Sequence, residues 1–205
     1  MVQGEKSRLL KIFTIGHSNH SLEVFLNLLK RSDIQVAVDI RSNPNSKVAL
    51  HFNRGRLGNY LKASGIKYLY FGKELGGRPQ VRDFYDSSGR VLYNRIAETP
   101  GFIKCIERLM QGVQDYRVAL LCSEENPVNC HRRLLVGRVL RDYGVRIEHI
   151  RGDGKVQSEE EVRDEEGFKR EGDSQLRLFE NEESSQWKSI QSVLPRRVPK
   201  NSSEH

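Results

Sequence analysis

The first 150 residues alternate short apolar runs with helical patterns, and this alternation limits the possible folds more than any other feature of the sequence. Five apolar runs, each closed by a glycine or by polar residues, have the length and composition of buried strands: residues 8–16, 34–40, 66–72, 116–122 and 145–150. Helical patterns over 21–33, 54–65, 90–112 and 130–144 separate them. The alternation predicts an α/β domain in which a mostly parallel, open sheet of about five strands has helices on both faces.

The chain changes character near residue 156. From there to residue 205 it is highly charged and poor in β-branched and aromatic residues. Such a composition buries too little apolar surface to offset the entropy of ordering the chain. We therefore expect a domain over residues 1–155 and a largely disordered, charged tail over 156–205, with room for one short helix.

Charge is distributed unevenly between these two parts. Residues 151–205 contain 10 Lys or Arg and 13 Asp or Glu, a net charge of −3, whereas residues 1–150 contain 24 and 14, a net charge of +10. A basic body is the usual electrostatic footprint of a protein that binds nucleic acid. Nucleic acid is therefore the expected partner.

Other features concern the cellular compartment. No run approaches the roughly 18 apolar residues of a membrane-spanning helix. The first residues, MVQGEKSRLL, lack the apolar core of a secretory signal, and three cysteines without such a signal indicate free thiols in a reducing compartment. We expect a cytoplasmic protein that makes no contact with membranes.

Polar residues gather directly after four of the predicted strands. They are His17 to His20 after the first, Asp39 to Asn43 after the second, Lys73 to Arg78 after the third, and Cys122 to Arg132 after the fourth. Parallel α/β sheets bind their ligands outside the carboxyl ends of the strands. The sequence therefore predicts one pocket at this edge of the sheet.

The residue types in this cluster suggest their roles. Asp39 and Glu124 are the candidate general acid and base, with His17 or His131 moving protons near neutral pH. Either Cys122 or Cys130 is a secondary candidate as a covalent nucleophile. Four arginines are the candidate phosphate ligands: Arg41, Arg78, Arg132 and Arg133. The alternative is structural, with Cys122 as a buried thiol and His17 and Asp39 as a buried polar pair.

A zinc site is the other alternative for the same residues. Cys122, Cys130, His131 and His17 are four ligands of the kind that zinc prefers. Their spacing differs from the usual C-x₂₋₄-C pattern, and neighbours such as Cys130 and His131 diverge by about 100° on a helix. We therefore assign no metal from the sequence, and the cofactor stays open.

Five segments resemble a known family. They are TIGHS, VDIRSNP, GIKYLYFGKELGG, LLCSEENPVNCHRR and HIRGDGKV, and in this order they are similar to the bacterial and archaeal domain of unknown function 488 family. The resemblance covers residues 11 to about 156. It implies a compact α/β domain that shares polar residues with the family, namely His17, Asp39, Arg41, Glu124, Cys130, His131 and Arg132. It implies no particular reaction.

The tail contains one further motif, SQLRLFEN. Its residues Gln175, Leu176, Leu178 and Phe179 resemble the peptide with which bacterial DNA polymerases and repair enzymes bind the sliding clamp. A charged segment presenting one amide and three apolar anchors suits such docking. The alternative is that these residues pack against the domain.

Taken together, these features predict an enzyme that hydrolyses a glycosidic or phosphodiester bond in a nucleic acid or nucleotide, acts in DNA repair and is recruited by the sliding clamp. Two alternatives stay open. The first is a non-catalytic adaptor that binds nucleic acid, and the second is an enzyme acting on a small anionic metabolite.

Overall fold

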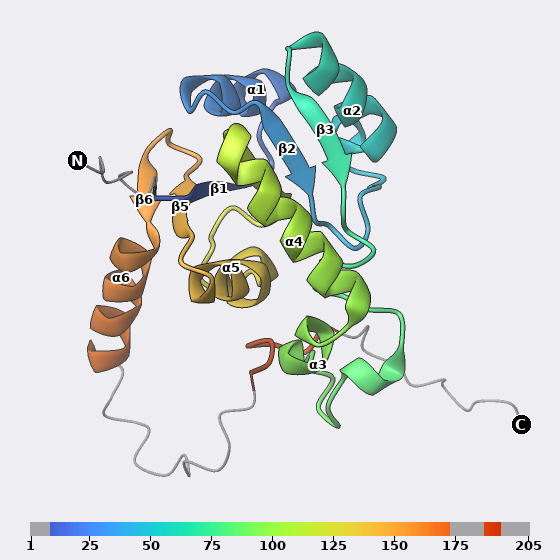
Figure 1. The fold of residues 1–205 in the computed structure, drawn as a ribbon, viewed down its shortest axis with the longest axis vertical. Coiled ribbons are helices and arrows are strands. Elements are labelled where there is room, and N and C mark those ends of the chain that lie inside the picture. Colours follow the sequence, from blue (N-terminus) through green and yellow to red (C-terminus); the bar gives the residue numbers. More distant parts are fainter. Residues whose placement is uncertain (1–8, 173–186, 194–205) are drawn as a thin grey trace, which may run out of the picture.

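The chain forms a six-stranded sheet in the computed structural model, which describes residues 9–172 and 187–193. The strands are β1 (Lys11–Gly16), β2 (Val36–Asp39), β3 (Lys67–Tyr70), β4 (Val118–Cys122), β5 (Arg146–Ile150) and β6 (Val156–Ser158). Their order is β3-β2-β4-β1-β5-β6, and only β6 runs antiparallel to its neighbour (Figure 1). The predicted mostly parallel α/β sheet is confirmed.

Helices follow the strands along the chain. They are α1 (Leu22–Arg31), α2 (Arg54–Ala63), α3 (Tyr93–Ala97), α4 (Pro100–Asp115), α5 (Arg138–Asp142) and α6 (Glu159–Gly172), with short η1 (Leu50–Phe52), η2 (Arg82–Phe84) and a π-helical segment η3 (Arg132–Gly137). Local chemistry sets their ends: the Ser21 hydroxyl caps α1, and Thr99 caps α4, which begins with Pro100. The helical region expected over 90–112, with an interruption near Pro100 and Gly101, is therefore found as α3 followed by α4.

Two apolar cores lie on opposite faces of the sheet. Along β1, Ile12 belongs to the core beneath α4 and α5, whereas Phe13 belongs to the core beneath α1 and α2. Successive side chains of a strand point to opposite faces, so a strand buried on both sides must be apolar throughout. This double burial explains why the strands are nearly continuous apolar runs.

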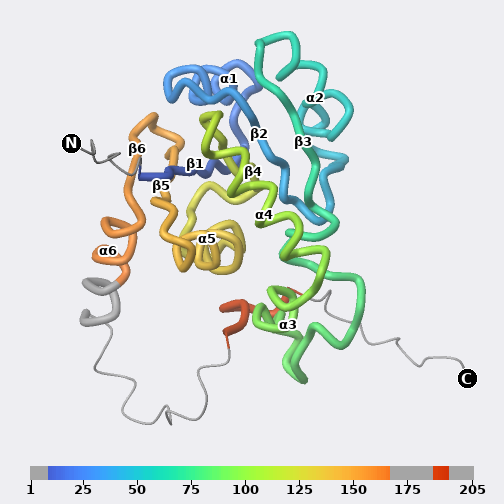
Figure 2. Tube along the Cα trace, in the orientation of Figure 1, coloured from blue at the N-terminus to red at the C-terminus, as the bar shows by residue number. Residues whose placement is uncertain are grey.

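The folded domain continues past residue 155, where the sequence placed its end. Strand β6 pairs with β5, and residues 187–193 lie beside α3 (Figure 2). The charged composition concealed this, because Glu159 at the start of α6 is buried and pairs with Arg133 of η3. The clamp-like peptide at 175–179 lies outside the described residues. Within the described ranges, no helix has both the length and the apolar character needed to cross a membrane.

Candidate functional site

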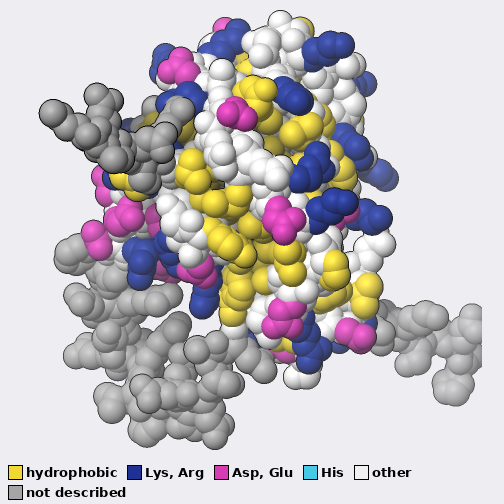
Figure 3. Space-filling view, in the orientation of Figure 1, with side chains coloured by type: hydrophobic (Ala, Val, Ile, Leu, Met, Phe, Trp, Pro, Cys, Tyr) yellow, Lys and Arg dark blue, Asp and Glu magenta, His cyan; other side chains and the backbone are white. Residues whose placement is uncertain are grey.

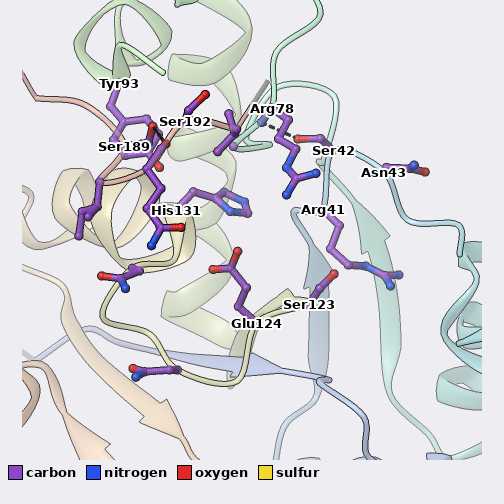
Figure 4. A pocket seen from close by; sticks show the side chains of 16 residues that line it. Arg41, Ser42, Asn43, Arg78, Tyr93, Ser123, Glu124, His131, Ser189 and Ser192 are labelled. Atoms are coloured by element: carbon purple, nitrogen blue, oxygen red, sulfur yellow. Dashed lines mark hydrogen bonds between the residues drawn. The ribbon is translucent and has the colours of Figure 1, made fainter. Parts of the chain in front are cut away.

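A pocket of about 470 Å³ opens at the carboxyl ends of β2 and β4, where the sequence predicted one (Figure 4). Side chains from several of the expected strand ends line it: Arg41, Ser42, Arg78, Ser123, Glu124 and His131. Its volume lies in the usual range of small-ligand sites. The predicted convergence of distant segments on one hollow therefore holds for these residues.

Asp39 lies beneath this pocket and is completely buried. Its carboxylate accepts two hydrogen bonds from the Arg41 side chain, at 2.9 and 2.6 Å, and a third from the Tyr68 hydroxyl at 2.7 Å. A carboxylate enclosed in this way has no contact with a ligand in the pocket. The structure therefore gives Asp39 a role in holding Arg41, and not the acid–base role expected from the sequence.

His17 is fixed on the other side of Arg41. The Arg41 guanidinium donates to His17 Nε2 at 3.1 Å, so His17 Nδ1 carries the proton and donates to the Ser18 carbonyl at 2.9 Å. The ring stacks on Phe52, with 4.2 Å between ring centroids. Burial lowers the pKa of His17 to about 4. His17 is therefore a neutral, structural histidine, and the expected proton transfer near neutral pH does not suit it.

This low pKa makes stability depend on pH. Unfolded His17 takes up a proton below its ordinary pKa of 6.5, whereas folded His17 stays neutral down to about 4. Stability is therefore complete above pH 6.5 and is lost as the pH falls through that window, by about 2 kcal/mol at pH 5. Urea unfolding above pH 6.5 and at pH 5 measures this loss in the wild-type chain and in His17→Gln, a variant that keeps an acceptor for Arg41. The free energy of unfolding should depend less on pH in the variant. Equal pH dependence would contradict the assignment.

The two thiols lie below the pocket wall. Cys122 and Cys130 are 4% and 0% exposed, and the Cys130 thiol donates to the Cys122 sulfur at 3.3 Å. This hydrogen bond, together with nearby His131, holds the pKa of Cys122 well below its usual range, while burial raises the pKa of Cys130. Burial opposes the charged form of His131, but the neighbouring Cys122 raises the pKa of this ring. Only His131 of these three lines the pocket, so direct nucleophilic attack by either thiol is not supported.

Three of the four arginines expected to bind phosphate already make hydrogen bonds or ion pairs with other groups of the protein. All three guanidinium nitrogens of Arg41 bond to Asp39, His17 or the Phe52 carbonyl.

Arg132, fully buried, donates to the Thr14 hydroxyl and to the carbonyls of Glu124 and Glu125. Arg133 pairs with Glu159 and Glu166. The expectation that Arg132 and Arg133 bind phosphate is therefore wrong, since these side chains hold the Glu124 loop and α6 in place.

Glu124 and Arg78 remain exposed in the pocket (Figure 4). Within residues 9–172 and 187–193, neither side chain has a hydrogen bond or ion pair to the protein. Backbone contacts position them: Arg132 binds the Glu124 carbonyl, and the Arg78 amide donates to the Ser42 hydroxyl at 2.8 Å. Gly16 allows the Glu124 loop to approach β1, because a Cβ there would lie 1.7 Å from the Glu124 carbonyl oxygen.

One wall of the pocket comes from a segment that the sequence assigned to the tail. Residues Ser189 to Val193 line it, and Trp187 anchors them by donating to the Leu134 carbonyl at 2.6 Å and by lying under Arg138. Sequence reasoning missed this wall. The one tryptophan of the chain, standing in a charged segment, was the available signal for a docked region.

The fold and the pocket define a class: an α/β protein with a polar pocket at the carboxyl edge of a mostly parallel sheet. The family model described as domain of unknown function DUF488 matches residues 21–139, and the chain belongs to this family. The match includes the polar residues that follow β2, β3 and β4 but not His17 to His20, which follow β1. Comparison with curated proteins and comparison with solved structures gave no significant match.

Proposed function

We propose that this protein is an enzyme that hydrolyses a glycosidic or phosphodiester bond in a nucleotide or nucleic acid. The observation that carries the proposal is that Glu124 and Arg78 line the same pocket. One is acidic and the other basic, and neither side chain has a protein partner among the described residues. A positioned carboxylate can activate water or protonate a leaving group. An unpaired guanidinium at the same site suits a phosphate group.

The remaining pocket groups agree with a polar, anionic substrate. Ser42, Ser123 and Asn126 offer neutral hydrogen-bonding groups, and His131 lines the same pocket. Lys and Arg side chains gather on the edge of the molecule that carries α2 and β3 (Figure 3). Helix α2 contributes Arg54, Arg56 and Lys62 to this surface. Such a surface attracts a phosphate backbone.

The wider setting that we propose is DNA repair in the cytoplasm. It depends on the clamp-like peptide, whose residues Gln175 to Phe179 lie outside the described part of the chain. A pull-down with purified sliding clamp, comparing the chain with a variant in which Leu178 and Phe179 are replaced by alanine, tests this recruitment. Equal capture of both chains would remove it.

Arg78→Gln is expected to weaken binding of a nucleoside monophosphate by about 10-fold or more, because the variant loses a charge-assisted contact to phosphate. Arg82→Gln is the matched control, since Arg82 is also exposed, lies four residues further on and does not line the pocket. Titration calorimetry at low and high salt measures both. The wild-type affinity should fall with salt.

Hydrolysis of a panel of nucleotides and of intact and damaged DNA and RNA, with and without divalent metal, tests the reaction itself. Binding without any turnover would support the non-catalytic adaptor. Turnover of a small anionic metabolite alone, without affinity for nucleic acid, would support the small-molecule enzyme. Equal weakening of phosphate binding by Arg78→Gln and Arg82→Gln would contradict the role of the pocket.

A further inference from the structure

Three side chains beneath the pocket wall bring their ligand atoms into a small triangle. The sulfur atoms of Cys122 and Cys130 are 3.3 Å apart, and His131 Nδ1 lies 3.7 Å from the first and 4.0 Å from the second. Within the described part of the chain, no further Cys, His, Asp or Glu belongs to this group. The three residues come from the end of β4 and from the two positions that precede η3, so the fold itself brings them together.

The size of this triangle suits a tetrahedral metal ion. Zinc binds sulfur at about 2.3 Å and histidine nitrogen at about 2.0–2.1 Å, so ligand atoms at tetrahedral angles lie about 3.6–3.8 Å apart. The 3.7 Å separation falls within this range, the 3.3 Å separation lies below it and the 4.0 Å separation lies above it, both by less than half an ångström. Small side-chain rotations are therefore enough to complete the coordination.

The His131 ring is also oriented as a metal ligand would be. Its Nε2 donates to the Ile40 carbonyl at 3.0 Å, which directs Nδ1 toward the two sulfur atoms. Metal-binding histidines usually donate their second ring nitrogen to a carbonyl or carboxylate in this way. Gly77 packs against the ring, since a Cβ there would lie 2.6 Å from His131 Cγ. The orientation is thus fixed from two sides, independently of the thiols.

Of the two sequence arguments against a metal, the one from helix geometry does not hold in the structure. It assumed that Cys130 and His131 diverge on a helix, but Cys130 lies in a turn before η3, with its amide donating to the Pro127 carbonyl, and His131 is the residue that precedes η3. The fourth expected ligand, His17, is excluded because Arg41 and Ser18 occupy both of its ring nitrogens. The structure therefore selects three of the four residues.

We propose that Cys122, Cys130 and His131 bind one zinc ion, with the fourth position left for water or an anion. The pocket adjoins this site, because His131 lines it and because Ser123 and Glu124, which follow Cys122, line it as well. Three protein ligands and one exchangeable position are typical of catalytic zinc, which lowers the pKa of its bound water. The zinc proposal does not depend on the proposed hydrolysis. Metal binding is measured without a substrate, so the two proposals can fail separately.

Cobalt(II) is the probe for this site, since it replaces zinc and absorbs visibly when thiolates bind it. The reduced full-length chain, freed of metal by a chelator, should bind one equivalent of cobalt and show a thiolate-to-cobalt charge-transfer band that zinc abolishes. Cys122→Ala and Cys130→Ala should each lose this band. Cys105→Ala is the matched control and should keep it, because Cys105 is a buried thiol of α4 that lies outside the triangle.

Circular dichroism checks that each variant folds. If either variant does not fold, zinc competition with a chromophoric chelator on the wild-type chain decides the question by its stoichiometry. One tightly bound equivalent, together with retention in Cys105→Ala, supports the site. No charge-transfer band in the wild-type chain, an equal loss in Cys105→Ala, or a Cys122–Cys130 disulfide that forms in place of metal binding would overturn it.

Discussion

Replacing Glu124 by glutamine is expected to slow hydrolysis of a nucleotide substrate by about 10²–10⁴-fold while leaving folding unchanged. The change keeps the size of the side chain and removes its ability to exchange a proton. Glu124 is exposed in the pocket and has no protein partner among the described residues, so no ion pair is lost. Turnover under saturating substrate, with urea unfolding on the same sample, measures the two effects separately.

The neighbouring residue supplies the control. Glu125 carries the same group one position along the loop, but its carboxylate binds Arg151 at 2.9 and 3.0 Å and does not line this pocket. Glu125→Gln should therefore weaken the loop but keep the turnover number of the folded protein. If both variants lost turnover equally, Glu124 would act through the shape of the loop and its assignment as the acid–base group would fail.

In contrast to Glu124→Gln, Asp39→Asn is expected to change stability: it should lower the free energy of unfolding by about 3–5 kcal/mol. Asp39 is completely buried, and its partner Arg41 is 5% exposed. An asparagine leaves the Arg41 charge buried without a counterion, and it also weakens the acceptor for the Tyr68 hydroxyl. Urea unfolding monitored by circular dichroism gives the change directly.

Two further variants test whether the loss of stability comes from the buried pair of Asp39 and Arg41. Asp33→Asn removes an exposed carboxylate and should be nearly silent. Asp39→Asn combined with Arg41→Met should recover part of the lost stability, because the pair is then removed together. A loss below about 1 kcal/mol in Asp39→Asn alone, which is the range of exposed ion pairs, would show that the pair is not a buried anchor.

The sequence determined five of the six strands and the edge of the sheet on which the site lies. Apolar runs such as 34–40 and 116–122 identify strands because burial on both faces demands apolar side chains throughout. The carboxyl ends of parallel strands meet at one edge, so the polar residues after them had to share it. Pro100 and Gly65 indicated helix boundaries for an equally local reason, namely their restricted or permissive backbone.

Only the tertiary structure decided what each polar residue does there. Asp39 and Glu124 are both carboxylates after a strand, yet one is enclosed by Arg41 and Tyr68 while the other faces the pocket. Partners far apart in the chain make this difference, as when Glu159 from the charged C-terminal region pairs with Arg133. Charge and pattern are properties of the sequence, whereas burial and pairing depend on which distant side chains the fold brings into contact.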